Sequence, residues 1–335
     1  MKESESVNNN VQISPELLQQ LNMRQNHQQD DEIDLAELWR AIWAGKWIII
    51  VITSLFAVAS VFYALSLPNI YKSEALLAPA EQQSGGLGGM ASQFGGLASI
   101  AGINLGGGKA DKTGLALEIM KSRAFVFKFI EKYKITPELM ASKEWNMNTN
   151  ELVYDVNVYD VTNKLWLRTV KAPLEAKPSL QESYKKFQSL VSVVQDKGNS
   201  MVTISIEHYS PKIAKQWVDW LIEAINDEMK NRDLTEAKSS VTYLNKQLEN
   251  TKVADFQKVL YQLIEEQTKT IMFANVRKQY ALKTIDPALV PELKSGPKRA
   301  FICVLGVFLG GLLAVIVVLI RYFSNSHRQK LSVNT

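Results

Sequence analysis

The chain is poor in the residues that form disulfides, metal sites and the commonest catalytic motifs. Its 335 residues include one cysteine, Cys303, so no intrachain disulfide can form, and the three histidines are too dispersed to make one metal site with it. No HExxH, CxxC or GxSxG string occurs. The adjacent acids Glu265 and Glu266 fall on a predicted helix, where neighbouring side chains diverge and cannot share a proton across a substrate. The sequence therefore favours a non-enzymatic function, with no catalytic, cofactor-binding or metal-binding residue.

The excess of one sign of charge over the other is also small. The 38 lysines and arginines are scattered among 34 acidic residues, which leaves a formal net charge of +4. A nucleic-acid-binding protein usually gathers its cations on one stripe or face. Nucleic acid is therefore not expected as a partner.

Long apolar runs, in contrast, are present near both ends of the chain. Residues 47–67 and 300–320 form two uncharged runs of 21 residues. At about 1.5 Å rise per residue, each can cross the roughly 30 Å hydrocarbon core of a bilayer. The first run follows 46 mostly polar residues and so does not resemble a cleavable signal peptide. We expect a two-pass membrane protein with both termini in the cytoplasm and residues 68–299 in the periplasm, although flanking positive charges are nearly balanced.

The segments outside the two runs differ in character. Residues 1–29 are rich in Asn and Gln and are predicted to be a disordered cytoplasmic tail. Residues 30–46 predict a juxtamembrane amphipathic helix, whose tryptophans suit the membrane interface better than a binding role. Residues 321–335 are a short cytoplasmic tail in this interpretation.

The segment between the runs mixes strand and helix patterns and predicts an α+β domain. Residues 70–78, 190–195 and 202–208 read as strands, and residues 115–133 as an amphipathic helix. Ser179 and the pair Ser210-Pro211 are typical helix starts. The stretch up to about residue 177 has no regular pattern.

A glycine-rich segment interrupts this domain. Ten of the 17 glycines lie in residues 85–108. A P-loop needs a glycine five residues before its Gly-Lys pair and Ser or Thr after it, whereas Ile103 and Ala110 occupy those positions. A mobile lid or an inter-subunit loop is the better interpretation.

Residues 233–282 stay helical in pattern for about 50 residues, with one weak break near 251–255. A narrow apolar stripe with spacings of three and four predicts packing against another helix. If continuous, this helix would be about 75 Å long and would project well beyond a compact domain.

Four strings in order resemble the Wzz chain-length determinants, the first class of bacterial polysaccharide co-polymerases. They are IDLAELWRAIWAGKW, LPNIYKSEALLAP, SPKIAKQWVDWLIEAIN and IDPALVPELKSGPKRAFICVLGVFLGGLL. The resemblance implies inner-membrane proteins whose periplasmic α/β base carries a long extended helix and which assemble into closed, bell-like homo-oligomers. The fold class expected here is thus an α+β periplasmic domain with a long helical projection, anchored by two transmembrane helices.

The resemblance also implies partners and candidate contact residues. The family sets the modal length of O-antigen or a related glycan made by a Wzy-type polymerase, so the homo-oligomer, the polymerase, the growing lipid-linked polysaccharide and the membrane are the expected partners. By position, the candidates for oligomer or polymerase contact are Pro287, Pro291, Pro297, Gly306 and Gly310. A lone GxxxG in an apolar span arises by chance about as readily as from packing.

Two other functions stay open at this point. A capsule or exopolysaccharide co-polymerase acting in export would need a kinase, and no P-loop is present, so the kinase would be separately encoded. A periplasmic sensor shares the two-span layout but would need a cytoplasmic output domain.

Overall fold

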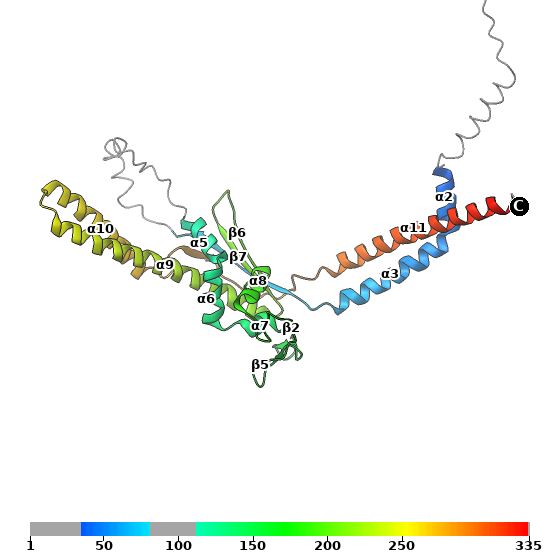
Figure 1. The fold of residues 1–335 in the computed structure, drawn as a ribbon, viewed down its shortest axis with the longest axis horizontal. Helices are drawn as coiled ribbons and strands as arrows, with labels where there is room; N and C mark the ends of the chain where they lie inside the picture. Colours follow the sequence, from blue (N-terminus) through cyan, green and yellow to red (C-terminus); the bar gives the residue numbers. More distant parts are fainter. Residues whose placement is uncertain (1–34, 81–111, 334–335) are drawn as a thin grey trace, which may run out of the picture. The chain divides into compact units, whose positions relative to one another are not determined.

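The computed structural model describes residues 35–80 and 112–333 (Figure 1). The predicted tail 1–29 and the glycine-rich segment 85–108 lie outside the described residues. Contacts divide the described chain into two units, residues 35–66 with 299–333, and residues 67–298 without the gap. The fold class is the predicted one, a mixed helix and sheet unit with a long helix and two apolar helices.

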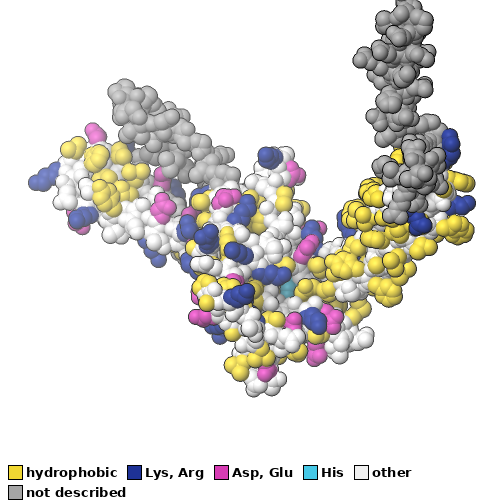
Figure 2. Space-filling view, turned by 45° about the vertical axis from the view of Figure 1, so that its right-hand side comes forward, with side chains coloured by type: hydrophobic (Ala, Val, Ile, Leu, Met, Phe, Trp, Pro, Cys, Tyr) yellow, Lys and Arg dark blue, Asp and Glu magenta, His cyan; other side chains and the backbone are white. Residues whose placement is uncertain are grey.

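The first unit consists of α2 (Leu35–Ala44), α3 (Lys46–Ser66) and α11 (Arg299–Val333). Residues 46–66 and 299–324 are long and apolar enough to cross a membrane. Hydrophobic side chains cover this helix pair (Figure 2). Helix α11 continues past the predicted boundary at residue 320, because residues 321–333 contain no proline or glycine that would end it.

A four-stranded antiparallel sheet forms the base of the second unit. Its order is β6-β7-β1-β8, with β1 at Tyr71–Pro79, β6 at Val191–Gln195, β7 at Val202–His208 and β8 at Leu282–Asp286. Strand β1 pairs with β7 in the register Ala75 with Ile204 and with β8 in the register Leu77 with Thr284. The strands predicted at 70–78, 190–195 and 202–208 are confirmed as β1, β6 and β7, whereas β8 was not predicted and begins at the last residue of the stretch predicted as helix.

Two helices pack on this sheet, α8 (Leu180–Leu190) and the first part of α9. The helices α5 (Lys112–Lys121), α6 (Arg123–Tyr133) and α7 (Thr136–Met140) pack in turn on α8 and α9. Phe129, Phe187 and Trp217 are fully buried and pack on one another, with ring centroids 5.3 and 6.2 Å apart. Burying each such side chain contributes about 1.5–3 kcal/mol. The core therefore lies between the sheet and α6, α8 and α9.

The helix predicted at 115–133 is broken at Ser122. Its hydroxyl accepts a hydrogen bond from the Phe125 N–H at 3.3 Å and caps a new helix, α6. A serine side chain competes with the helical backbone for hydrogen bonds and is favoured at helix starts. At Ser179 the expected cap is confirmed and forms a full capping box with Glu182.

Two small hairpins fill the stretch that had no regular pattern. Strand β2 (Ser142–Asn146) pairs with β3 (Glu151–Tyr154), and β4 (Tyr159–Asp160) pairs with β5 (Leu165–Trp166). These strands have two to five residues, too few for alternation to be recognised in the sequence. They form a separate β-rich platform, residues 142–168.

The long helical segment differs from its predicted bounds. Helix α9 runs from Pro211 to Asn250 for 40 residues, about 60 Å, and α10 runs from Ala254 to Val276. Thr251 adopts an extended backbone (φ −105°, ψ 123°), and the chain reverses there, so that α10 returns along α9 (Figure 1). The weak break expected near 251–255 is thus the point at which the chain turns, and the apolar stripe packs α10 on α9, with Ala237, Leu260 and Ala274 buried.

Candidate functional site

The two candidate glycines lie on the face of α11 that packs against α3 of the same chain. A Cβ atom on Gly306 would lie 2.4 Å from the Cβ of Ser60, and one on Gly310 would lie 2.5 Å from the Cβ of Phe56. Moving four residues forward along α11 thus moves four back along α3, so the helices are antiparallel. Only glycine permits this approach, and the GxxxG spacing is a packing face within the chain.

The same close packing continues toward the start of α3. A Cβ atom on Gly45 would lie 2.3 Å from Cγ1 of Val318, while one on Gly311 would meet nothing closer than Thr53 Oγ1 at 3.9 Å. Ala64 and Ala314 are buried at the helix contact. The pair is therefore fixed by small residues along its whole length.

The three candidate prolines belong to the second unit, on the segment that connects β8 to α11. Pro287 directly follows β8 and is exposed, and Pro291 and Pro297 are half-buried. The segment is extended because proline fixes one backbone angle and donates no hydrogen bond. Pro287 does not end a helix, because α10 already ends at Val276 and the strand β8 intervenes.

Backbone and side-chain hydrogen bonds fasten this proline segment to the chain that follows α3. The Ser73 hydroxyl donates to the Leu289 carbonyl at 2.7 Å. The Ile70 N–H donates to the Gly296 carbonyl at 3.0 Å, and the Ser295 N–H donates to the Ile70 carbonyl at 2.8 Å. The segments next to the two apolar helices are thereby held together outside the helices.

Three large apolar side chains of the proline segment point away from this attachment. Leu289 is 70% exposed, Val290 45% and Leu293 85%, although Ala288 between them and β8 is buried in the core. Single exposed apolar residues are normal, but a run of them on a fixed, extended segment marks a contact surface. We call these three side chains the apolar edge.

Asn226 on α9 holds the strand that leads into the proline segment. Its Oδ1 accepts from the N–H groups of Ala281 (2.8 Å) and Leu282 (3.0 Å), and its Nδ2 donates to the Leu282 carbonyl at 3.0 Å. The amide thus makes the hydrogen bonds that a neighbouring strand would make at the free edge of β8. Sequence reasoning missed this residue, because an asparagine inside a helix gives no sign of a partner 56 residues away.

An acidic side chain on the same helix reinforces this attachment. Asp233 Oδ2 receives the Lys112 ammonium at 2.6 Å and the Tyr280 hydroxyl at 2.5 Å. Burial and the Asp233 carboxylate raise the pKa of Tyr280, so its hydroxyl remains a donor. Helix α9 therefore positions both the start of α5 and the entry to β8.

A buried histidine joins the sheet to α7, the helix that precedes the β-rich platform. His208 Nδ1 accepts from the Ser210 N–H at 3.0 Å, which places the ring proton on Nε2, 3.1 Å from the Glu138 carbonyl. Burial lowers the pKa of His208 to about 4, so the ring is neutral near pH 7. Within the described residues, no group of three or more His, Cys, Asp or Glu side chains is arranged to hold a metal ion.

Part of the chain is similar to a known protein family. Residues 31–133 match the family described as Wzz: Chain length determinant protein. Among solved structures, a full-length bacterial polysaccharide co-polymerase shares 13% identity over 88% of this chain and 99% of its own, with a TM-score of 0.37. A fragment of WzzB, the polysaccharide co-polymerase of Salmonella Typhimurium, shares 12% identity over 68% of this chain and 100% of its own, with a TM-score of 0.28. No curated protein matches. The part of the chain that matches the chain length determinant family, residues 31–133, includes α2, α3, β1, α5 and α6.

Proposed function

We propose that the chain is a non-enzymatic, oligomeric regulator that sets polysaccharide chain length in a Wzy-dependent pathway, with O-antigen or a related glycan as the product. The observation that carries the proposal is the match of residues 31–133 to the chain length determinant family. The antiparallel pair of apolar helices, one before and one after the α+β unit in the sequence, agrees with it.

The proposed location is the bacterial inner membrane. Helices α3 and α11 cross it, both termini face the cytoplasm, and residues 67–298 form the periplasmic part. The 21 residues of α3 span about 30 Å, the thickness of the hydrocarbon core. A long segment between two spans crosses the membrane largely regardless of its charge, which supports this orientation.

The candidate contact residues take different roles in this proposal. Gly306 and Gly310 keep α11 tight against α3, so their effect on oligomer packing or on the polymerase is indirect. The apolar edge, presented between Pro287 and Pro297, contacts the polymerase directly. Its exposure and its fixed backbone support this assignment.

The test is the glycan length distribution on a silver-stained lipopolysaccharide gel. Deletion of the gene is expected to broaden the distribution without abolishing the glycan, and restoring the gene is expected to recover the length mode. An unchanged ladder would refute the proposal and direct the search to capsule or exopolysaccharide export with a separately encoded kinase.

A matched pair of variants tests the apolar edge. Leu293→Ser is expected to lose the length mode while the protein is still made and inserted. Val194→Ser, on the exposed side of the edge strand β6 at 59% exposure, is the control and should keep the mode. Equal behaviour of the two variants would remove the apolar edge from the mechanism.

A further inference from the structure

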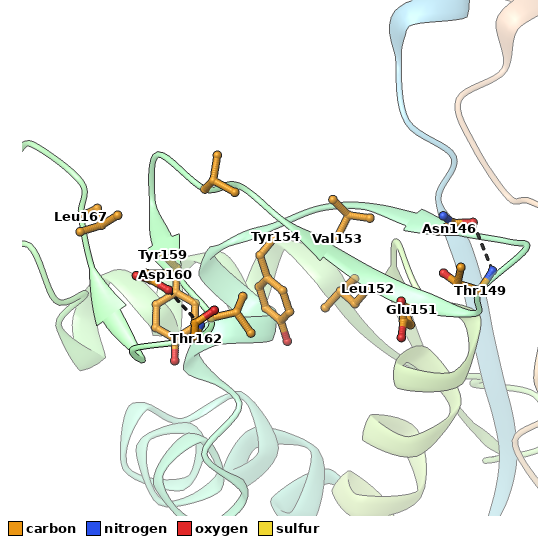
Figure 3. A pocket seen from close by; sticks show the side chains of 12 residues that line it. Asn146, Thr149, Glu151, Leu152, Val153, Tyr154, Tyr159, Asp160, Thr162 and Leu167 are labelled. Atoms are coloured by element: carbon orange, nitrogen blue, oxygen red, sulfur yellow. Dashed lines mark hydrogen bonds between the residues drawn. The ribbon is translucent and has the colours of Figure 1, made fainter.

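The β-rich platform carries a surface cleft of about 840 Å³ that the functions described above do not use (Figure 3). It lies between the β2–β3 hairpin and the β4–β5 hairpin. Tyr154 from β3 and Tyr159 from β4 stand side by side in it, with ring centroids 6.0 Å apart and tilted by 52°. The cleft therefore has an aromatic wall.

The rim of the cleft is fixed by local hydrogen bonds. Asn146 Oδ1 accepts from the Thr149 N–H at 3.3 Å, and Asp160 Oδ1 accepts from the Thr162 N–H at 2.9 Å (Figure 3). Tyr159 is 8% exposed and packs on Trp166, with centroids 4.8 Å apart. The wall is thus formed before any ligand arrives, which lowers the entropy cost of binding.

Several polar groups of the cleft remain unused. Among the described residues, the hydroxyls of Tyr154, Tyr159 and Thr162 and the carboxylate of Glu151 have no hydrogen-bond partner. Burial, aided by Glu138 and Tyr159, raises the pKa of Tyr154 to about 12, so its phenol is a donor at any physiological pH. The cleft offers both donors and acceptors next to an apolar surface of Val153, Val156 and Leu167.

This combination fits a sugar ring better than other ligands. A pyranose has an apolar C–H face that packs on an aromatic ring and hydroxyls that pair with phenols and carboxylates. The described residues that line the cleft include Glu151 and Asp160 but no lysine or arginine, so a phosphate or a carboxylated sugar would meet only negative charge. The chemistry selects a neutral or amino sugar.

We propose that this cleft is a saccharide-binding site that holds one neutral or amino-sugar unit of the growing polysaccharide, with Tyr154 as the stacking residue and Glu151 as the hydroxyl acceptor. The assignment of the sugar to the growing polysaccharide rests on the proposed function. Such a site would let the regulator bind directly, on its α+β unit, the polysaccharide whose length it sets.

The test measures binding of polysaccharide to the purified full-length protein in detergent. The probe is the surface polysaccharide of the source strain, freed of lipid by mild acid, and polygalacturonate is the acidic comparison. Tyr154→Ala is expected to weaken binding about tenfold and Tyr154→Phe less, because the ring remains. Glu151→Gln, at an exposed position where folding is unaffected, is expected to weaken binding about threefold.

Tyr243→Ala is the matched control, because Tyr243 is 63% exposed on α9, far along the chain from the platform. It should bind as the unchanged protein does. Absence of binding by the unchanged protein, normal binding by both Tyr154→Ala and Glu151→Gln, or equally tight binding of polygalacturonate would each overturn the site. A deletion strain with an altered glycan ladder alongside such a result would refute the cleft alone, whereas an unaltered ladder would refute the proposed function.

Discussion

Replacing Asn226 with alanine should release β8 from α9 and loosen the entry to the proline segment. Asn226 is 3% exposed, and its amide makes the only described hydrogen bonds to the Leu282 N–H and C=O on the side of β8 facing away from β1. Each buried backbone group left without a partner costs about 1–3 kcal/mol. The Ala281 N–H is less buried and adds less, so we expect local opening of β8 to become easier by about 3 kcal/mol.

Hydrogen exchange read by mass spectrometry measures this opening directly. A change of about 3 kcal/mol corresponds to roughly 100-fold faster exchange in a peptide that covers residues 281–286. Asn231→Ala, on an exposed turn of the same helix, should leave that peptide unchanged. Exchange in Asn226→Ala within about threefold of the unchanged protein would refute the reasoning.

A second substitution at the same position separates the lost hydrogen bonds from the lost volume. Asn226→Asp keeps the acceptor for the N–H groups but turns a carboxylate oxygen toward the Leu282 carbonyl. Protonation converts that oxygen into a donor, so the ratio of the exchange rate in the β8 peptide to that of the unchanged protein at the same pH should fall as the pH falls toward 5. A ratio that does not change with pH would show that packing, not the donor, secures β8.

Three further predictions concern other parts of the chain. The pKa of His208 is lowered to about 4 from 6.5, so its contribution to stability is complete above pH 6.5 and falls by about 3 kcal/mol as the pH falls to 4. His208→Gln should therefore show a flatter pH dependence of the unfolding midpoint than the unchanged protein. Parallel curves for the two proteins would contradict this. Gly310→Ala should weaken the helix pair by about 1–3 kcal/mol, because its new Cβ would lie 2.5 Å from an atom of α3, while Gly311→Ala should be tolerated. Denaturation in detergent followed by circular dichroism distinguishes the two variants. Equal midpoints would mean that α3 shifts to make room for the new Cβ. Arg168→Lys should cost about 1–2 kcal/mol in thermal unfolding, because the paired bonds to Glu182 at 2.7 and 2.9 Å need the planar guanidinium; an unchanged midpoint would show that charge alone suffices.

The sequence alone determined the elements whose signal is local. The two apolar runs predicted the starts of the two apolar helices, α3 and α11, within one residue, because a run that crosses a bilayer needs about this length. Strands were predicted at 70–78, 190–195 and 202–208, within one residue of those observed, and in the last of them apolar and polar residues alternate because side chains on a strand point to opposite faces. Ser179 and Ser210 predicted their helix starts, because a serine side chain supplies the bond that the first turn lacks.

The candidate site was only partly accessible from the sequence. The glycine spacing indicated a close helix contact, but nothing local identified Ser60 and Phe56 as the residues that meet it. The prolines were candidates by resemblance alone, and the attachment of their segment through Ser73 and Ile70 joins residues more than 200 positions apart. Such pairs become visible only when the chain has folded.

Tertiary structure decided the features that depend on a distant partner. Residues 233–282 have a helical pattern with one weak break near 251–255, but only the folded chain shows that it reverses at this break and that α10 packs back along α9. Asn226 and the tyrosines of the cleft likewise have no distinctive sequence pattern, and their roles follow from their contacts with β8 and with each other, respectively. The sequence determined which two runs are long and apolar enough to cross a bilayer and where three of the strands lie, since these depend on neighbours along the chain. Only the tertiary structure decided which surfaces meet and which polar groups are left to bind a ligand.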